Sequence, residues 1–263
     1  MAALARPAAT VVLVRPAPEG VGPWQTYLLR RSAQSTVLAD SWVFPGGTLR
    51  PDDLAPESQQ LFPNDSLQAA HVALSRSPGE PPATPTESLG FFVASARELF
   101  EEAGVLPGHA DLRVSGDRLA ELRDAVEHGQ PFFQVAEELH ARFSLADFSY
   151  YAHWITPEAI PQRFDTRFFL ARMPAGQDAM PSPFEMAEGM WVEVPTALEQ
   201  AKARELTIHF ATLNHLRRLA PFQAVDDLFE FALTKPVVPV MPDTRERDGR
   251  IVPSLPPELE GIW

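Results

Sequence analysis

The chain has 263 residues, of which 45% are hydrophobic and 22% are charged, so it can bury a full core and is too apolar for wholesale disorder. Its formal charge of −13 argues against nucleic acid as a partner, because binding a phosphate backbone relies on Lys and Arg. The absence of cysteine excludes disulfides, thiolate catalysis and cysteine metal sites.

Proline is frequent, with 27 residues, about twice the typical usage of roughly 5%, and this predicts long, stiff connections. No apolar run reaches the roughly 18 residues of a membrane span, so no membrane partner is expected. Residues 1–7 lack the apolar core of a signal peptide, and residues 260–263 carry no peroxisomal address of the Ser-Lys-Leu type. The expected compartment is the cytoplasm.

The first two predicted strands, Thr10–Arg15 and Trp24–Arg31, are β-branched or aromatic runs separated by a Pro/Gly-rich connection, which indicates a hairpin. Residues 32–41 form a polar loop. Trp42–Phe44 then leads into Pro45-Gly46-Gly47, a turn at which glycine lets the backbone approach a ligand closely.

Hydrophobic periodicity predicts the remaining elements. They are helices over Asp117–Glu127, Pro131–Phe143, Thr196–Arg204 and Leu206–Leu219, and strands over Ser149–Thr156, Arg163–Arg172 and the MWVEV stretch of 190–194. Residues 174–184 read as a loop, and the chain from Lys235 reads as extended or as a loose hairpin. Mixed strands with helices on either side indicate an α/β or α+β architecture.

The sequence Arg97-Glu-Leu-Phe-Glu-Glu-Ala-Gly104-Val reads as a helix that ends at Gly104. Glu98, Glu101 and Glu102 then share one face, where they repel one another, and Arg97 alone cannot balance them. Carboxylate clusters of this kind suit Mg²⁺ or Mn²⁺. The alternative from these residues alone is a solvated acidic helix face.

Residues 97–105 match the second half of the signature of the Nudix hydrolases, which is Gly, five residues, Glu, seven residues, then Arg-Glu-apolar-any-Glu-Glu-any-Gly-apolar. Gly47, within Phe-Pro-Gly-Gly, matches its opening glycine. The chain departs from the signature at Asp53, which replaces its Glu, and in about 36 residues inserted between Asp53 and Arg97. This interrupted motif resembles the subfamily that contains the mammalian peroxisomal coenzyme A diphosphatase.

The resemblance implies a Nudix-type α/β/α sandwich with a mixed sheet. A domain over residues 1–234 is expected, with an insertion at about 54–92 that folds out from the motif as a helix pair or a helix plus loop, and residues 77–86 as a linker. A Pro-rich extension over 235–263 would lie on this domain or on a second subunit. A homodimer is expected, since isologous dimers are the commonest oligomers.

The resemblance also implies the roles of the site residues. Metal would be held by Glu98, Glu101, Glu102 and the carbonyl of Gly47, although glycine at 47 is also compatible with an ordinary loop. Arg97 would orient a carboxylate by a charge-assisted hydrogen bond, and Asp53, being shorter than Glu, would support the site without binding metal. Catalysis would involve Glu101, Glu102 and a general base, for which Glu185 and Glu188 are candidates unless they are surface charge. His153, His209 and His215 do not cluster and are expected to be packing or surface residues.

The implied reaction is metal-dependent hydrolysis of a small nucleotide-containing diphosphate. Arg31-Ser32 and Phe44-Pro-Gly46-Gly47 match the spacing of a coenzyme A motif, whose central Arg and Gly are replaced here by Thr36 and Asp40. Arg31, Ser32, Phe44 and Gly46 are therefore predicted to bind coenzyme A or acyl-coenzyme A, unless residues 28–32 are only a strand end. The two replacements favour a nucleoside-diphosphate sugar or dinucleotide substrate instead. A ligand sensor without catalysis is the alternative from another class, and three intact repelling glutamates argue against it.

Overall fold

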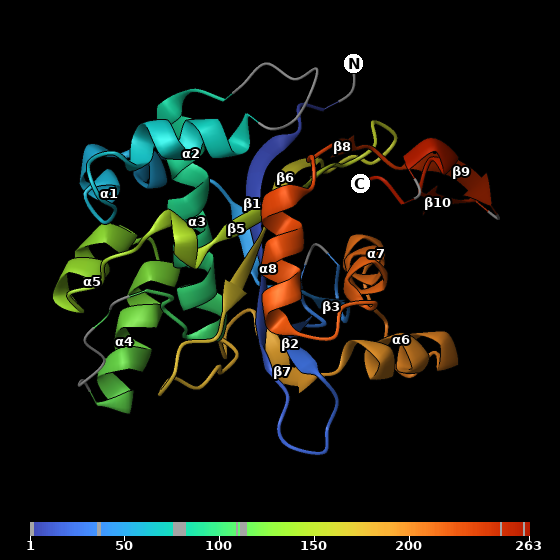
Figure 1. Cartoon of the computed structure of the whole chain (residues 1–263), viewed down its shortest axis with the longest axis horizontal. Coiled ribbons are helices and arrows are strands. Elements are labelled where there is room, and N and C mark those ends of the chain that lie inside the picture. Colours follow the sequence, from blue (N-terminus) through green and yellow to red (C-terminus); the bar gives the residue numbers. More distant parts are fainter. Residues whose placement is uncertain are drawn as a thin grey trace.

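The computed structural model describes residues 3–35, 38–75, 83–108, 110, 115–247, 249–259 and 261–263. Within these ranges a mixed eight-stranded sheet is flanked by helices on both faces (Figure 1). The strands are β1 (Arg6–Pro16), β2 (Trp24–Arg31), β3 (Trp42–Val43), β4 (Gly46–Thr48), β5 (Ser149–Ile155), β6 (Phe164–Arg172), β7 (Met186–Val192) and β8 (Pro239–Val240). The expected α/β/α architecture with a mixed sheet is confirmed.

Strand β1 lies at the centre of the sheet, whose order is β3-β2-β1-β6-β5-β8. It pairs in parallel with β6 and antiparallel with β2, and β4 pairs with it over Ala8–Thr10. The predicted hairpin of the first two strands is confirmed, and β7 extends the sheet beyond β2. This arrangement places the short glycine strand β4 directly against the buried central strand.

One face of the sheet packs against the helices that precede β5. These are α1 (Pro56–Gln59), α2 (Ser66–Leu74), α3 (Pro85–Ala103), α4 (Gly116–Glu127) and α5 (Phe132–Glu138), with 3₁₀ turns η1 (Pro51–Leu54) and η2 (Leu145–Asp147). The core on this side includes Val11 and Phe169 of the sheet with Phe92 and Phe100 of α3, all at most 1% exposed. Helix α3 is therefore held rigidly against the centre of the sheet.

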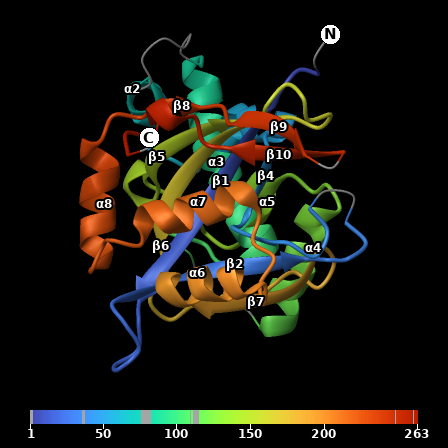
Figure 2. The same cartoon turned by 90° about the vertical axis from the view of Figure 1, so that its right-hand side faces the viewer.

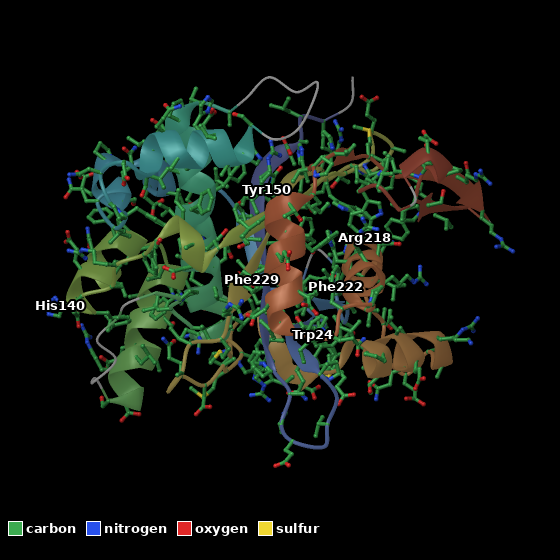
Figure 3. All side chains as sticks on the ribbon, viewed as in Figure 1. Trp24, His140, Tyr150, Arg218, Phe222 and Phe229 are labelled. Carbon is green, nitrogen blue, oxygen red and sulfur yellow. The ribbon has the colours of Figure 1, made fainter. Side chains whose placement is uncertain are left out.

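The opposite face is covered by α6 (Val194–Ala203), α7 (Phe210–Leu219) and α8 (Val225–Thr234). Leu216 of α7 and Leu228 of α8 are fully buried there. The side chain of Trp24 also joins this layer, because its indole N–H donates to the carbonyl of Phe222 at 2.9 Å (Figure 3). Sequence periodicity does not predict α8, whose ten residues lie between two segments with extended or irregular structure.

The last part of the chain contains β9 (Asp243–Arg247), β10 (Arg250–Ser254) and the 3₁₀ turn η3 (Pro257–Leu259). Strands β9 and β10 form an antiparallel hairpin, which lies at the edge of the molecule in Figure 1 and runs across the front of the view in Figure 2. Trp263 returns to the body, where only 4% of it is exposed. In the described part of the chain, no helix combines the length and apolar character needed to cross a membrane.

Several predicted boundaries are wrong. Helix α5 ends at Glu138, short of Phe143, because His140 adopts a left-handed conformation (φ 48°) that a helix cannot continue through; it lies at the periphery in Figure 3. Helix α7 begins at Phe210 and not at Leu206, and β7 spans Met186–Val192 and not 190–194. Pro85 and Thr86, predicted as linker, form the first turn of α3, while residues 76–82 lie outside the described ranges.

Candidate active site

Helix α3 carries the four charged residues of the motif and is defined at both ends by its own sequence. Thr84 accepts a hydrogen bond from the amide of Glu87 (3.2 Å), and the Glu87 carboxylate accepts one from the amide of Thr84 (2.8 Å), which forms a capping box. Gly104 ends the helix with φ +68°, as the sequence predicts, in a conformation that glycine adopts without strain. The last two turns are thus regular helix, and Glu98, Glu101 and Glu102 lie on one face.

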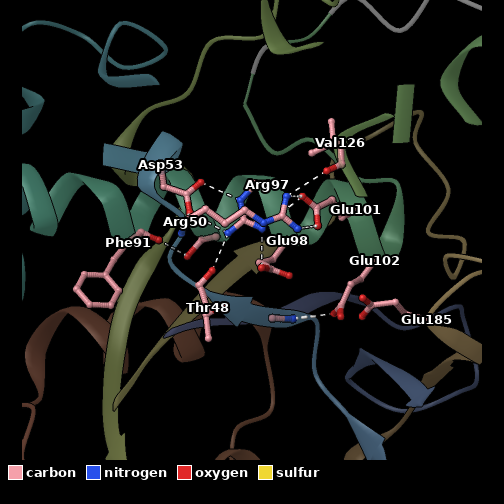
Figure 4. A network of polar contacts seen from close by, with 12 residues as sticks. Thr48, Arg50, Asp53, Phe91, Arg97, Glu98, Glu101, Glu102, Val126 and Glu185 are labelled. Carbon is pink, nitrogen blue, oxygen red and sulfur yellow. Dashed lines mark hydrogen bonds and ion pairs between the residues drawn. The ribbon is translucent and has the colours of Figure 1, made fainter. Parts of the chain in front are cut away.

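Arg97 is fully buried and is bound by Asp53, the residue that directly precedes the insertion (Figure 4). Its Nε and Nη2 atoms each donate to one oxygen of Asp53 at 2.8 Å, and Nη2 also donates to the carbonyl of Thr48 at 2.9 Å. Nη1 donates to Glu98 at 2.6 Å. Asp53 therefore fixes the arginine that in turn fixes Glu98, which is the supporting geometry expected of this residue.

Glu98 and Glu102 lie against the two glycines of β4. A Cβ atom on residue 47 would collide with the Glu98 carboxylate, so only glycine permits this approach. The amide of Gly46 donates to Oε2 of Glu102 at 2.8 Å. Both carboxylates are buried, at 6% and 4% exposure, and both meet the cavity beside the glycine strand.

Glu101 accepts a hydrogen bond from Nη1 of Arg97 at 3.3 Å and has a second partner, Arg50, which the sequence motif does not identify. Both guanidinium Nη atoms of Arg50 donate to Glu101 at 2.8 Å, and Nη1 also donates to the carbonyl of Val126 at 3.1 Å (Figure 4). The signal for Arg50 is in the sequence, because three same-face glutamates need more positive charge than Arg97 supplies. Arg50 is the basic residue between Gly47 and Asp53.

The pKa values of Glu101 and Glu102 remain raised despite these arginines. Burial, and then the neighbouring Glu98 carboxylate, raise the pKa of Glu101 to about 7, against the opposing effect of Arg97 and Arg50. The same two causes raise the pKa of Glu102 well above its usual range. Excess negative charge in a buried oxygen-rich site is what a hard divalent cation neutralises.

The donor chemistry therefore fits Mg²⁺ or Mn²⁺, but the three glutamates do not converge. Among the residues that the structure describes, no three His, Asp or Glu side chains are arranged to hold a metal ion together. The physical reason is that Arg50 binds both oxygens of Glu101. Glu98, beside Gly47, and Glu102, bound by the amide of Gly46, are the two carboxylates that remain directed to the glycines of β4.

The structure separates the two candidate bases. Glu185 lines the cavity and lies 3.6 Å from Arg31, which also lies 3.9 Å from Glu102. Glu188 lies within β7 and pairs with Arg30 at 3.3 Å, and it is not among the residues that line the cavity. Only Glu185 is close to the carboxylates of α3.

The cavity has a volume of about 610 Å³. It is lined by Arg31, Phe44, Gly46 and Gly47 of the predicted binding element, whereas Ser32 is not among its lining residues and accepts a hydrogen bond from the amide of Gln34 at 3.3 Å. His209 also lines it, while His153 and His215 are fully buried packing residues. The opposite wall of the cavity is apolar and includes Trp154, Phe164, Phe168 and Phe210.

The chain matches the family model described as the NUDT19 Nudix domain over residues 5–219. It is 28% identical over 276 residues to the acyl-coenzyme A diphosphatase NUDT19 of Gallus gallus, covering 86% of this chain and 71% of the relative. Identity to the protein of the same name from Homo sapiens is 27% over 259 residues, covering 87% and 68% of the two chains.

A NUDIX hydrolase structure from Alicyclobacillus acidocaldarius has the same fold, with a TM-score of 0.67 at 21% identity over 86% of this chain and 96% of that one. The resemblance seen in the motif is confirmed by these findings. Because the family match spans most of the chain, this protein belongs to the NUDT19 Nudix domain family of hydrolases.

Proposed function

We propose that this hydrolase cleaves the diphosphate bond of coenzyme A or acyl-coenzyme A, with Mg²⁺ or Mn²⁺, to give 3′,5′-ADP and phosphopantetheine or its acylated form. The observation that carries the proposal is the single cavity that joins the buried glutamates of α3 to an apolar wall. Such a cavity suits a diphosphate with a long uncharged arm. The two relatives are named acyl-coenzyme A diphosphatases, which supports the same substrate class.

Glu98, Glu102 and the carbonyl of Gly47 would hold the cation. When bound, a divalent cation neutralises charge on phosphoryl oxygens and lowers the pKa of a bound water. The chain's own part is to fix the carboxylates in place. Arg97 orients Glu98, and the Gly46 amide orients Glu102 through the contacts described above.

Arg31 and Arg50 face the same cavity and would contact the non-bridging oxygens of the diphosphate. Guanidinium groups suit this role because their planar donors match phosphate oxygens. Glu185 would accept a proton from the attacking water as its oxygen bonds to phosphorus and the anhydride P–O bond breaks; the leaving phosphate keeps the bridging oxygen. Its carboxylate is 52% exposed, so it can pass the proton to solvent.

A second candidate, a nucleoside-diphosphate sugar or dinucleotide pyrophosphatase, rests on the loss of the Arg and Gly of the coenzyme A motif at Thr36 and Asp40. Asp40, which replaces a glycine of the coenzyme A motif, has φ 55° and lies 3.3 Å from Arg30, so its charge is partnered outside the cavity. The motif glycine is thus lost although the left-handed backbone that favours glycine is kept. Thr36, at the other replaced position, lies outside the described residues.

The test is a product assay with Mg²⁺ or Mn²⁺ on coenzyme A, octanoyl-coenzyme A, NADH, ADP-ribose, UDP-glucose and diadenosine polyphosphates. Release of 3′,5′-ADP from the coenzyme A compounds alone is the expected result. Turnover of only the other diphosphates would replace the proposed substrate by the second candidate. Binding without turnover of any compound would move the protein to the class of ligand sensors.

A further inference from the structure

The floor of the cavity runs across four strands of the sheet, away from the glutamates. Thr48, Ala8, Thr166 and Trp154 are paired neighbours on β4, β1, β6 and β5, and all four line the cavity. Neighbouring strands lie roughly 4.8 Å apart, so three intervals place Trp154 roughly 14 Å from the glycine strand. The cavity is therefore elongated, with the carboxylates at one end and Trp154 at the other.

The far end differs in chemistry from the carboxylate end. We define the apolar arm as the part of the cavity lined by Trp154, Ile160, Phe164, Phe168, Phe210 and two prolines of the C-terminal segment, Pro242 and Pro253. Arg6 also lines the cavity, and its guanidinium lies over the ring of Phe164 at 5.0 Å, so the arm has a cation at its edge. This cation would offset only part of the desolvation cost of a fragment with several phosphates, whereas an acylated pantetheine chain is uncharged.

The C-terminal segment that supplies the two prolines lies beyond the family match, which ends at residue 219. Three contacts hold it to strand β5, which carries Trp154 of the apolar arm. Strand β8 pairs with β5 next to Trp154, the Lys235 ammonium donates to the carbonyl of Tyr151 at 2.8 Å, and Trp263 packs edge-on against Trp154 with ring centroids 4.9 Å apart. The segment is thus built into the wall of the cavity.

We propose that the apolar arm binds the acyl-pantetheine half of the substrate, and that the C-terminal segment is the element that makes the enzyme prefer acylated over free coenzyme A. This inference rests on the proposed function for the position of the diphosphate at the glutamates. Each methylene buried in the arm contributes up to roughly a fourfold gain in affinity. Specificity for the acyl group would thus reside partly outside the segment that the family model covers.

The test is calorimetric binding of octanoyl-pantetheine and of pantetheine, neither of which carries a phosphate. The full-length protein is expected to bind octanoyl-pantetheine at least tenfold more tightly. Pro253→Asp, which places a charge in the arm, is expected to remove that preference. Its matched control is Val252→Asp on the neighbouring residue, which is 44% exposed and does not line the cavity, and it is expected to change the affinity less than twofold.

Ile160→Asn provides a second variant on a different segment, with Ile251→Asn on the exposed hairpin as its control. Equal affinity for the two ligands, equal losses in a variant and its control, or displacement of octanoyl-pantetheine by 3′,5′-ADP would each overturn the proposal. These measurements need neither metal nor turnover. Absence of diphosphate hydrolysis in the product assay would therefore refute the proposed function alone.

Discussion

Arg50 binds both carboxylate oxygens of Glu101 at 2.8 Å, and this pair joins the beginning of the motif to its helix. The guanidinium occupies the oxygens that a metal ion would otherwise use, and it does so at a side chain with only 5% exposure. Arg50 and a bound cation therefore compete for the same carboxylate. Entry of a cation shared by all three glutamates therefore requires Arg50 to move.

Replacing Arg50 by Ala is expected to raise the affinity of the substrate-free protein for Mn²⁺ by about tenfold, because a competing positive charge is removed near the site. Turnover should fall, since the variant also loses a contact to phosphoryl oxygens. Electron paramagnetic resonance of free Mn²⁺ measures the first effect without substrate. Arg30→Ala, which removes a cation paired with Asp40 and Glu188, is the control. Unchanged or weaker Mn²⁺ binding in the Arg50 variant would contradict the competition.

Glu185 and Glu188 form a matched pair for locating the general base. Both are about half exposed and three residues apart, but only Glu185 lines the cavity. We expect Glu185→Gln to lower kcat by about 100-fold or more, as removal of a general base does, and Glu188→Gln to change it less than about twofold. Initial rates at saturating substrate give the kcat values of the two variants for this comparison. Equal activity of the two variants would assign the base to a glutamate of α3.

Asp53→Asn is expected to reduce the free energy of unfolding by about 3 kcal/mol, because it removes the carboxylate that binds Nε and Nη2 of the buried Arg97 guanidinium. Urea denaturation followed by circular dichroism measures the loss. Asp52→Asn is the control: it is the neighbouring residue and it does not contact Arg97. A wild-type midpoint for the Asp53 variant would show that Thr48, Glu98 and Glu101 suffice to hold Arg97.

The lowered pKa of His209 predicts that the folded protein loses stability in acid. Desolvation lowers its pKa from 6.5 to about 4, so between these values the unfolded chain binds a proton that the folded protein does not. The contribution of His209 to the free energy of unfolding is complete above pH 6.5 and is lost as the pH falls toward 4. The loss is about 2 kcal/mol after allowance for the partial exposure of the side chain. His215, whose pKa is also lowered by burial, acts in the same direction.

The measurement is the urea midpoint between pH 4 and pH 7 for wild type and His209→Asn. The variant should show a shallower decline in acid. His128→Asn is the control, because His128 is exposed and its pKa is raised by the carbonyl and carboxylate of Asp124, which gives a contribution of opposite sign. An identical pH profile for wild type and the His209 variant would exclude His209 as a source of the decline.

The sequence predicts most of the catalytic helix and the central strands because their signals are local. Gly104 marks the end of α3, and the spacing of Glu98, Glu101 and Glu102 places them on one face. Strand β2 is predicted to the residue, since an unbroken run from Trp24 to Arg31 is bounded by turn residues. The family follows from the same motif.

What could not be predicted depends on contacts distant in sequence. The partnership of Arg50 with Glu101 spans 51 positions, and nothing local indicates that this arginine turns toward the helix. Helix α8 lacks caps, with Ala224 at its start, and is held by burial of Leu228 and Phe229 against the sheet. The difference between Glu185 and Glu188 appears only once β7 pairs with β2 and directs Glu188 to Arg30.

The Asp53–Arg97 ion pair also determines how well the protein tolerates changes in the length of the chain between these two residues. The Asp53–Arg97 ion pair joins the two ends of a loop. The entropic cost of closing a loop grows slowly with its length, so doubling the length adds only about 0.6 kcal/mol. Breaking a buried ion pair costs several times more, about 3–5 kcal/mol. The ion pair therefore keeps Asp53 and Arg97 in place when the length of the loop between them changes. Changes in the length of the connection between α2 and α3 are therefore expected to leave Arg97 and Glu98 in place, whereas the segment from α1 to α2 supplies Leu61, Phe62 and Ala70 to the core and cannot be exchanged freely.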